Sequence, residues 1–192
     1  LPKSLGSYLW YLSSVPYWWA KCKEITSHAA GHLSDADKVF VPKIEYSAVI
    51  WEARVILAVY VAVVVAMLTF DWAGPLYYWF IPVLLGEPVM RFVRMTEHVG
   101  MPPVSNMRAN TRTNLVSVVW QWLCWNMNYH AEHHYASSVP YHALPRMHEL
   151  LAGELPVERG GYFAAHADML AQLRGDKPRC DSDVILEVAE KS

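Results

Sequence analysis

The sequence predicts an all-α integral membrane protein, in which two transmembrane helices form a hairpin and interfacial and cytoplasmic helices carry a cluster of histidines. Three observations predict this class. Hydrophobic residues make up 54% of the 192 residues and charged residues only 18%, a composition that favours a membrane protein over a soluble one. Two apolar stretches flank the short connection 71–75, and residues 126–134 contain three histidines at helical spacing.

The first 45 residues are rich in aromatic side chains, which gather in two clusters at 8–12 and 17–19. Tyr and Trp side chains favour the headgroup level of a bilayer. We therefore expect an interfacial helix here, broken near Pro16.

His28 and His32 stand four residues apart and would share one face of a helix. This H-x-x-x-H spacing is also that of many metal-binding pairs. The surrounding residues are polar, and three charged side chains follow within six positions of His32. A solvated pair is therefore the preferred interpretation, and a ligand pair is the alternative.

The two apolar stretches predict the membrane hairpin. Residues 55–70 contain no charged side chain, and the bilayer core of about 30 Å requires about 20 residues at about 1.5 Å each. Including the apolar residues before this stretch, we expect the first span at about 48–70. The second span is expected at about 74–92, where Pro82 and Pro88 would kink a helix without excluding it from a membrane.

The distribution of positive charge predicts the orientation of this hairpin. The connection between the spans contains no Lys or Arg, whereas both flanks contain several, among them Lys21, Lys23, Lys38, Lys43, Arg91, Arg94, Arg108 and Arg112. Positive loops stay in the cytoplasm. Both flanks, both ends of this chain and the histidine cluster are therefore expected on the cytoplasmic side.

Beyond the second span, the helix is expected to continue to Gly100, and residues 101–114 are expected to form a polar loop. Residues 115–125 are apolar but too few to cross a bilayer, so they predict a short helix that lies against the membrane. A polar helix is expected at about 162–174, followed by an extended tail from Asp176.

The histidine cluster is the strongest functional signal. His130, His133 and His134 have offsets of 0, +3 and +4, which place three imidazoles on one helical face. Without a metal, each of these rings would need a separate hydrogen-bond partner. We therefore expect a metal site, and the residues leave iron, zinc and copper open. Asn126, four residues before His130, would share this face and could hold a water near the metal.

Other classes of partner are disfavoured by composition. The formal net charge is −2, and no run of clustered Lys or Arg is present, so no nucleic-acid partner is expected. The three cysteines are odd in number and far apart. A disulfide framework is therefore not expected, and a reducing compartment is the simpler assumption.

These motifs resemble the C-terminal part of the membrane fatty-acid desaturase family. The resemblance rests on segments that occur in this order: Thr96-Glu97-His98 after the hydrophobic hairpin, N-M-N-Y-H-A-E-H-H at 126–134, Val139-Pro140 and Leu144-Pro145. It covers residues 1–157 and leaves 158–192 as a cytoplasmic C-terminal helix and tail.

The resemblance implies a cytoplasmic site of non-haem iron, with two irons in the full-length parent, held by three histidine boxes. His130, His133 and His134 match the final box, and His98 resembles an additional ligand of some members. Glu97 or Glu132 could orient the ring N–H groups of the ligands. The resemblance implies no catalytic side chain beyond the ligands.

The implied reaction introduces a C=C bond into an alkyl chain, using O₂ as co-substrate and two electrons. The implied partners are a membrane lipid or acyl-chain substrate and an electron donor of the ferredoxin or cytochrome b5 type. A hydroxylase or ketolase of the same superfamily is the alternative. An alternative of another class is a non-enzymatic membrane protein that binds haem or zinc.

The chain departs from the family pattern before the hairpin. The family places its first two boxes there, and nothing in this part of the chain matches an H-x(2,3)-H-H box. His28 and His32 have the spacing of the first box but stand where the family has a linker. We therefore expect the missing boxes before Leu1 and expect this chain alone to be inactive.

Overall fold

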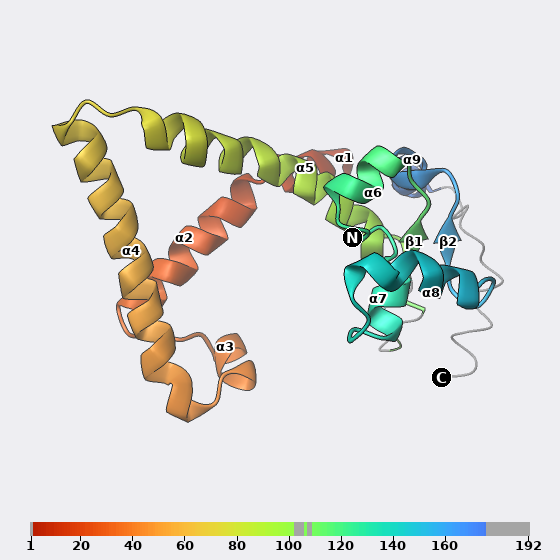
Figure 1. Cartoon of the computed structure of the whole chain (residues 1–192), viewed down its shortest axis with the longest axis horizontal. Helices are drawn as coiled ribbons and strands as arrows, with labels where there is room; N and C mark the ends of the chain where they lie inside the picture. The colour runs from red at the N-terminus through yellow and green to blue at the C-terminus, as the bar shows by residue number, and fades with distance from the viewer. Residues whose placement is uncertain (1, 102–105, 107–108, 176–192) are drawn as a thin grey trace. The chain divides into compact units, whose positions relative to one another are not determined.

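The computed structural model describes residues 2–101, 106 and 109–175, and most of these residues are helical (Figure 1). The elements in chain order are α1 Leu5–Leu12, α2 Val15–Ala29, α3 Asp35–Phe40, η1 Lys43–Glu45, α4 Tyr46–Thr69, η2 Leu76–Phe80, α5 Ile81–His98, β1 Thr113–Asn114, α6 Val118–Leu123, α7 His130–Tyr135, η3 Tyr141–Ala143, α8 Leu144–Leu150, β2 Val157–Glu158 and α9 Gly161–Gln172. The chain forms two compact units, of which one is Trp10–Pro88 and the other combines the residues before Trp10 with those from Val89 onward.

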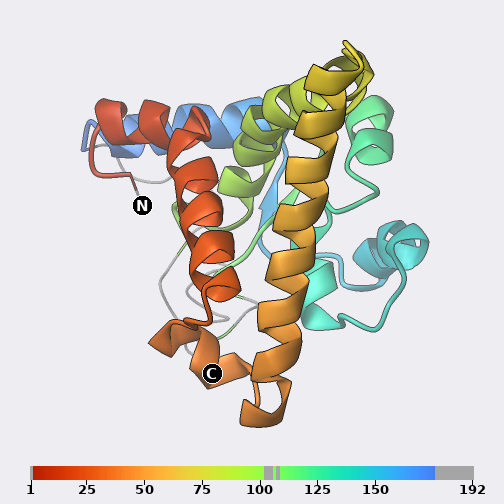
Figure 2. The same cartoon turned by 90° about the vertical axis from the view of Figure 1, so that its left-hand side faces the viewer.

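In the unit Trp10–Pro88, α2 lies beside α4 (Figure 2). The Nε of Arg54 on α4 donates a hydrogen bond of 2.9 Å to the carbonyl of Ala29 at the end of α2. The break before α2 falls at Ser14, which has a left-handed φ of 62°. The expected break near Pro16 is thus displaced by two residues, because proline is tolerated in the first turn of a helix, where its missing N–H has no partner to lose.

The first expected span is a single long helix. Residues Lys43–Thr69 form the one candidate membrane span among the described residues, long and apolar enough to cross a bilayer. Only 6% of its most apolar stretch is buried within the protein, as expected for a helix that faces lipid. The helix ends where Asp71 takes a left-handed φ of 47° and Pro75 follows.

The second expected span is helical but less apolar. The π-helix η2 leads directly into α5, which contains Pro88. Pro82 provides no N–H to the preceding turn, and the wider i→i+5 pattern of η2 occurs there. Four charged side chains lie in α5: Glu87, Arg91, Arg94 and Glu97. These charges make α5 too polar to count as a candidate span. Of the two expected spans, only the first, which contains α4, is a candidate among the described residues.

The other unit is built around the second half of α5. The core includes Val93 and Met95 of α5, Leu144 of α8 and Tyr162 and Met169 of α9, all buried. Strands β1 and β2 form a parallel pair, with Thr113 opposite Val157 and Asn114 opposite Glu158. This two-residue pair was not expected from the sequence, since strands this short have no alternating pattern to detect.

A buried histidine joins three helices of this unit. The Nδ1 of His166 on α9 lies 2.8 Å from the hydroxyl of Tyr8 on α1. The Nε2 of the same ring lies 2.8 Å from the carbonyl of Phe92 on α5. A carbonyl can only accept, so Nε2 carries the proton and Nδ1 accepts from Tyr8. Burial lowers the pKa of His166, consistent with this neutral form.

In the second half of the chain, the helices lie close to the positions expected from the sequence. Helix α5 ends at His98, and Gly100 follows with a φ of 87°. The expected short helix at 115–125 is α6, and the expected polar helix at 162–174 is α9. Parts of the expected loop 101–114 and the whole tail from Asp176 lie outside the described residues.

Candidate metal centre

Helix α7 begins at His130 because the chain before it cannot continue a right-handed helix. Trp125 and Asn126 have left-handed φ values of 52° and 57°, a conformation that L-residues adopt singly and not in helices. The expected shared helical face of Asn126 and His130 is therefore wrong. The Asn126 amide instead donates to the carbonyl of Tyr141 at 3.2 Å.

Three imidazoles from two helices converge at one point. The Nε2 of His130 lies 3.0 Å from the Nε2 of His98 and 3.0 Å from the Nε2 of His134. One such nitrogen from each of the three rings lies within 4.8 Å of the other two. His98 comes from the end of α5, and the other two come from α7. Nitrogen atoms that face one another at this separation form a donor set that a transition metal can use.

Ring orientation is fixed for His98. Its Nδ1 lies 3.1 Å from the carbonyl oxygen of Asn110, and a carbonyl can only accept a hydrogen bond. Nδ1 therefore carries the proton, which leaves the lone pair on Nε2 directed at the cluster. This arrangement is the usual support of a metal-ligating histidine, whose second nitrogen donates to a carbonyl or carboxylate.

The electrostatics of the cluster favour neutral rings. Burial, followed by the neighbouring histidines, lowers the pKa of His130 to about 3, and the same causes lower the pKa of His134. Glu97 lies 3.6 Å from the Nε2 of His130, and burial raises the pKa of Glu97 to about 7. Because His130 is neutral at pH 7, this contact is not an ion pair. Neutral imidazoles are the form that binds a metal.

His133 lies beside the three converging rings. Its ring centre is 6.1 Å from that of His130 and 5.6 Å from that of His134. Its Nδ1 is buried and, like the Nδ1 of His130, has no hydrogen-bond partner among the described residues. Buried polar atoms of this kind usually have a partner. His133 also lines an adjacent pocket of about 370 Å³ together with Glu97 and Met127.

One family model, described as Fatty acid desaturase, matches residues 2–166. The chain belongs to the fatty acid desaturase family. No curated protein and no solved structure matches it. The family implies an oxidoreductase associated with a membrane and acting on lipid acyl chains. The all-histidine donor set fits the iron that these enzymes generally use, because imidazole is a suitable ligand for iron.

In this desaturase domain, the side chain of Glu132 contacts residues other than the histidine rings that it was expected to orient. Its carboxylate is fully buried, accepts a hydrogen bond from the hydroxyl of Thr113 and lies 2.5 Å from the Nδ1 of His148. Both contacts point away from the converging rings, because residue 132 falls on the opposite face of α7. Glu132 thus anchors α7 to β1 and α8, and its hydrogen bonds go to Thr113 and His148 and not to the converging rings.

Sequence reasoning missed His148 and Thr113 as partners of this carboxylate. A signal was present, since a carboxylate placed between ligand positions must face the protein interior and needs a donor there. The sequence contains several candidate donors downstream. It does not identify the one that meets Glu132.

Two adjacent residues at the start of β1, Arg112 and Thr113, connect α5 and α7, the helices that carry the converging histidines. The buried Arg112 donates to the carbonyls of Thr96 at 2.6 Å and Val99 at the end of α5. Its neighbour Thr113 holds Glu132 of α7. Helix ends leave carbonyls without intrahelical partners and attract positive charge. Arg112 and Thr113 therefore fix the end of α5 and the position of α7 from adjacent residues.

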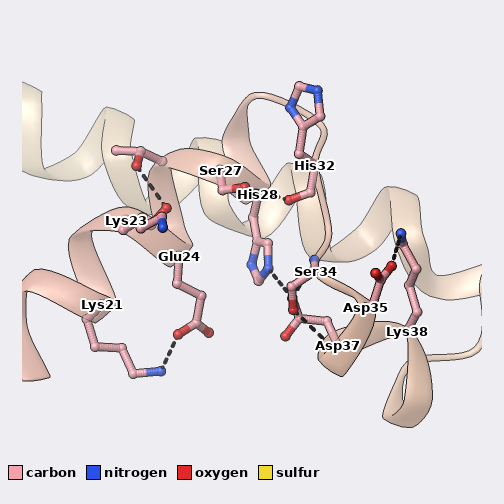
Figure 3. Close-up of polar contacts among 11 residues, drawn as sticks. Lys21, Lys23, Glu24, Ser27, His28, His32, Ser34, Asp35, Asp37 and Lys38 are labelled. Carbon is pink, nitrogen blue, oxygen red and sulfur yellow. Dashed lines mark hydrogen bonds and ion pairs between the residues drawn. The ribbon is translucent and has the colours of Figure 1, made fainter.

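A second histidine group lies at the junction of α2 and α3 (Figure 3). The Nε2 of His28 is 3.0 Å from Asp37, whose carboxylate also accepts hydrogen bonds from the backbone and hydroxyl of Ser34. The bond from the Ser34 backbone, together with a bond of 3.1 Å from the Asp37 backbone N–H to the Ser34 hydroxyl, forms a capping box at the start of α3. The Ser34 hydroxyl, and then His28, lower the pKa of Asp37 to about 2.

Glu24, His28 and Asp37 are also close enough to hold a cation, with donor atoms within 4.8 Å. Their present contacts account for them without one, since Glu24 pairs with Lys21 at 2.9 Å and Asp37 caps α3. His32 does not join this group, and its side chain points away from Asp37 (Figure 3). The two histidines of the H-x-x-x-H pair therefore do not converge.

Proposed function

We propose that this chain forms part of a membrane fatty-acid (acyl-lipid) desaturase, which introduces a C=C bond into an alkyl chain at a histidine-ligated diiron site. The observation that carries the proposal is the convergence of His98 on α5 with His130 and His134 on α7. Family membership supports the reaction class. A hydroxylase or ketolase of the same superfamily is the second candidate, and analysis of the product separates the two.

The ligands in this proposal are His98, His130, His133 and His134. Bound non-haem iron supplies the oxidation of an unactivated C–H bond with O₂ and two electrons, chemistry for which no side chain has a suitable proton affinity. The protein holds the rings neutral and oriented. Asn110 fixes the tautomer of His98, and Glu97 can hold a proton near His130 at neutral pH.

The pocket beside His133 supports an alkyl substrate. It has a volume of about 370 Å³, and its lining includes Met90, Val93, Leu123 and Met127 next to His130 and His133. Arg94 and Glu97 also line the pocket, and its apolar side chains provide a surface that fits a hydrocarbon chain. The substrate in this proposal is the acyl chain of a membrane lipid, and the electrons come from a donor of the ferredoxin or cytochrome b5 type.

A two-iron centre needs more nitrogen or oxygen donors than the four histidines provide. We therefore propose that residues outside this chain complete the site and that the chain alone is catalytically silent. The test is to express the chain by itself with a competent reductase, measure iron per protein and search lipid extracts for new double bonds. The expected result is fewer than two irons per chain and no product. Two irons together with desaturated lipid would contradict this part of the proposal and would favour His28 and His32 as a box.

The same expression system separates the remaining classes. A haem protein predicts a Soret absorbance band, which a non-haem iron protein lacks. A zinc-binding structural module predicts stoichiometric zinc in place of iron. Either result would overturn the desaturase proposal.

We also propose two spans, about 48–70 and 74–92, with both ends of this chain and the histidines in the cytoplasm. The support is the absence of Lys and Arg between the spans and their abundance on both flanks. Cysteines introduced at Gly74 and at Ser192, which lies outside the described residues, can be labelled in sealed cells. Labelling at Gly74 but not at Ser192 is expected from outside, and the reverse pattern would contradict the topology.

A further inference from the structure

An apolar pocket of about 300 Å³ lies within the unit Trp10–Pro88, between α2, α4 and the helical segment that begins with η2. Aliphatic side chains such as Ile56, Leu57 and Val83 form part of its wall. None of the four proposed iron ligands belongs to this unit. The volume is at the lower end of the range for ligand pockets, which is about 300–1,000 Å³.

Aromatic rings form another part of the wall. The ring centre of Tyr60 lies 5.2 Å from that of Trp79 and 6.0 Å from that of Phe80. Trp79 and Phe80 are parallel to within 2°. Rings packed in this way present a flat and rigid apolar surface, against which a flexible hydrocarbon chain can lie.

One polar atom in the pocket wall lacks a partner. The indole Nε1 of Trp18 is buried, and it has no hydrogen-bond acceptor among the described residues. A buried donor without an acceptor is costly, and most such groups in folded proteins are satisfied. A ligand that fills this pocket would therefore be favoured if it carried an acceptor oxygen next to its apolar part.

A cation follows one turn further along α2. Lys21 also lines the pocket, and residues three apart share one helical face. Its Nζ lies 2.9 Å from the carboxylate of Glu24, and both side chains extend from the same side of the helix (Figure 3). The pair has little net charge. It therefore suits a headgroup that contains a phosphate but is neutral overall.

We infer that this pocket binds a glycerophospholipid. One acyl chain lies against Ile56, Val83 and the aromatic wall, an ester carbonyl accepts the hydrogen bond of Trp18 Nε1, and the phosphate lies near Lys21. Such lipids surround any membrane-associated desaturase domain, and α4 is the candidate span of this chain. The inference does not require this lipid to be a substrate, so it goes beyond the proposed reaction.

The ester carbonyl provides the most selective test. The chain purified in detergent is incubated with diester phosphatidylcholine or with diether phosphatidylcholine of the same chain length, and retained lipid is counted by native mass spectrometry. The diester is expected to be retained about fivefold better, the effect of one hydrogen bond to a buried donor. Trp18→Phe should abolish this preference. Trp19→Phe is the matched control, because Trp19 is 75% exposed on the same helix, and it should leave the preference unchanged.

The cation is tested in the same way. Lys21→Gln should reduce retention of both lipids, whereas Lys23→Gln, at an exposed position nearby, should not. Equal retention of diester and diether by the wild-type chain would overturn the inference, as would a complex with detergent alone. Equal effects of Trp18→Phe and Trp19→Phe would do the same. None of these results bears on the histidines, so iron content and product formation still test the proposed reaction independently.

Discussion

His28 and His130 each lie on a helix four residues before another histidine, yet their surroundings differ. The ring of His130 faces two other imidazoles and has a strongly lowered pKa, because burial and those neighbours disfavour its charged form. The ring of His28 faces the carboxylate of Asp37, which caps α3. Equal spacing therefore does not imply equal chemistry. The partners that other segments bring to each pair decide whether it is a ligand set or a structural junction.

The largest expected difference between the two groups is in turnover. In the full-length enzyme, His130→Ala, His133→Ala and His134→Ala should each reduce product to background, because each removes a proposed ligand. His28→Ala and His32→Ala should leave turnover largely unchanged. Product in lipid extracts and iron per protein are measured for all five variants. Full activity in any of the first three, or iron loss in His28→Ala, would show that the wrong histidine group has been assigned.

A smaller effect is expected from the carboxylate that anchors α7. Thr113→Val removes the hydroxyl that donates to Glu132 while keeping the side-chain shape, and Glu132→Gln removes the charge that pairs with His148. Groups that hydrogen-bond a ligand directly typically change metal affinity by about 10- to 100-fold, and Glu132 acts only through the position of α7, so at most about a 10-fold loss is expected. Iron affinity and the absorption spectrum of the Co²⁺-loaded enzyme are the measurements.

Thr113→Ser is the matched control for this prediction. It keeps the hydroxyl and should restore affinity and spectrum to near the wild-type values. Loss of affinity in Thr113→Ser equal to that in Thr113→Val would indicate a packing effect in place of the hydrogen bond.

The smallest effect is expected at the α2–α3 junction. Ser34→Ala removes the helix cap of α3 and should cost about 1 kcal/mol of local stability. Asp37 has a pKa lowered from 3.8 to about 2, so its contribution is fully present above about pH 4 and is lost as the pH falls towards 2. Hydrogen exchange in α3 reports both effects.

Asp35→Asn is the control for this prediction, because it alters only the exposed pair with Lys38. It should change hydrogen exchange in α3 very little, and a large change would contradict the capping assignment.

The sequence was sufficient for the elements whose signals are local. The uncharged stretch 55–70 and the apolar residues before it predicted a helix at 48–70, and α4 runs Tyr46–Thr69. Gly100 predicted the end of α5, because its φ of 87° suits glycine. The expected helix at 162–174 corresponds to Gly161–Gln172. In each case the residues that decide the element lie within it or next to it.

The misplaced features depend on distant parts of the chain. Asn126 does not share a helical face with His130, because Trp125 and Asn126 both take left-handed conformations. Helix propensity does not predict two consecutive non-glycine residues in this conformation. The direction of Glu132 depends on Thr113 and His148, which are 19 and 16 residues away. The pairing of β1 with β2 likewise joins segments separated by a helical region. Tertiary contacts decide such features, and local patterns do not contain them.

The hydrogen bond between Tyr8 and His166 joins residues 158 positions apart. At a synthesis rate of about 5–20 residues per second, roughly 8 to 32 s separate the emergence of these two residues from the ribosome. All of α4 and α5 leaves the ribosome in that interval, whereas α1 cannot dock on α9 until the end of it. The unit that carries the proposed iron ligands is therefore the last part of the described chain to close, after the candidate span in α4 has already left the ribosome.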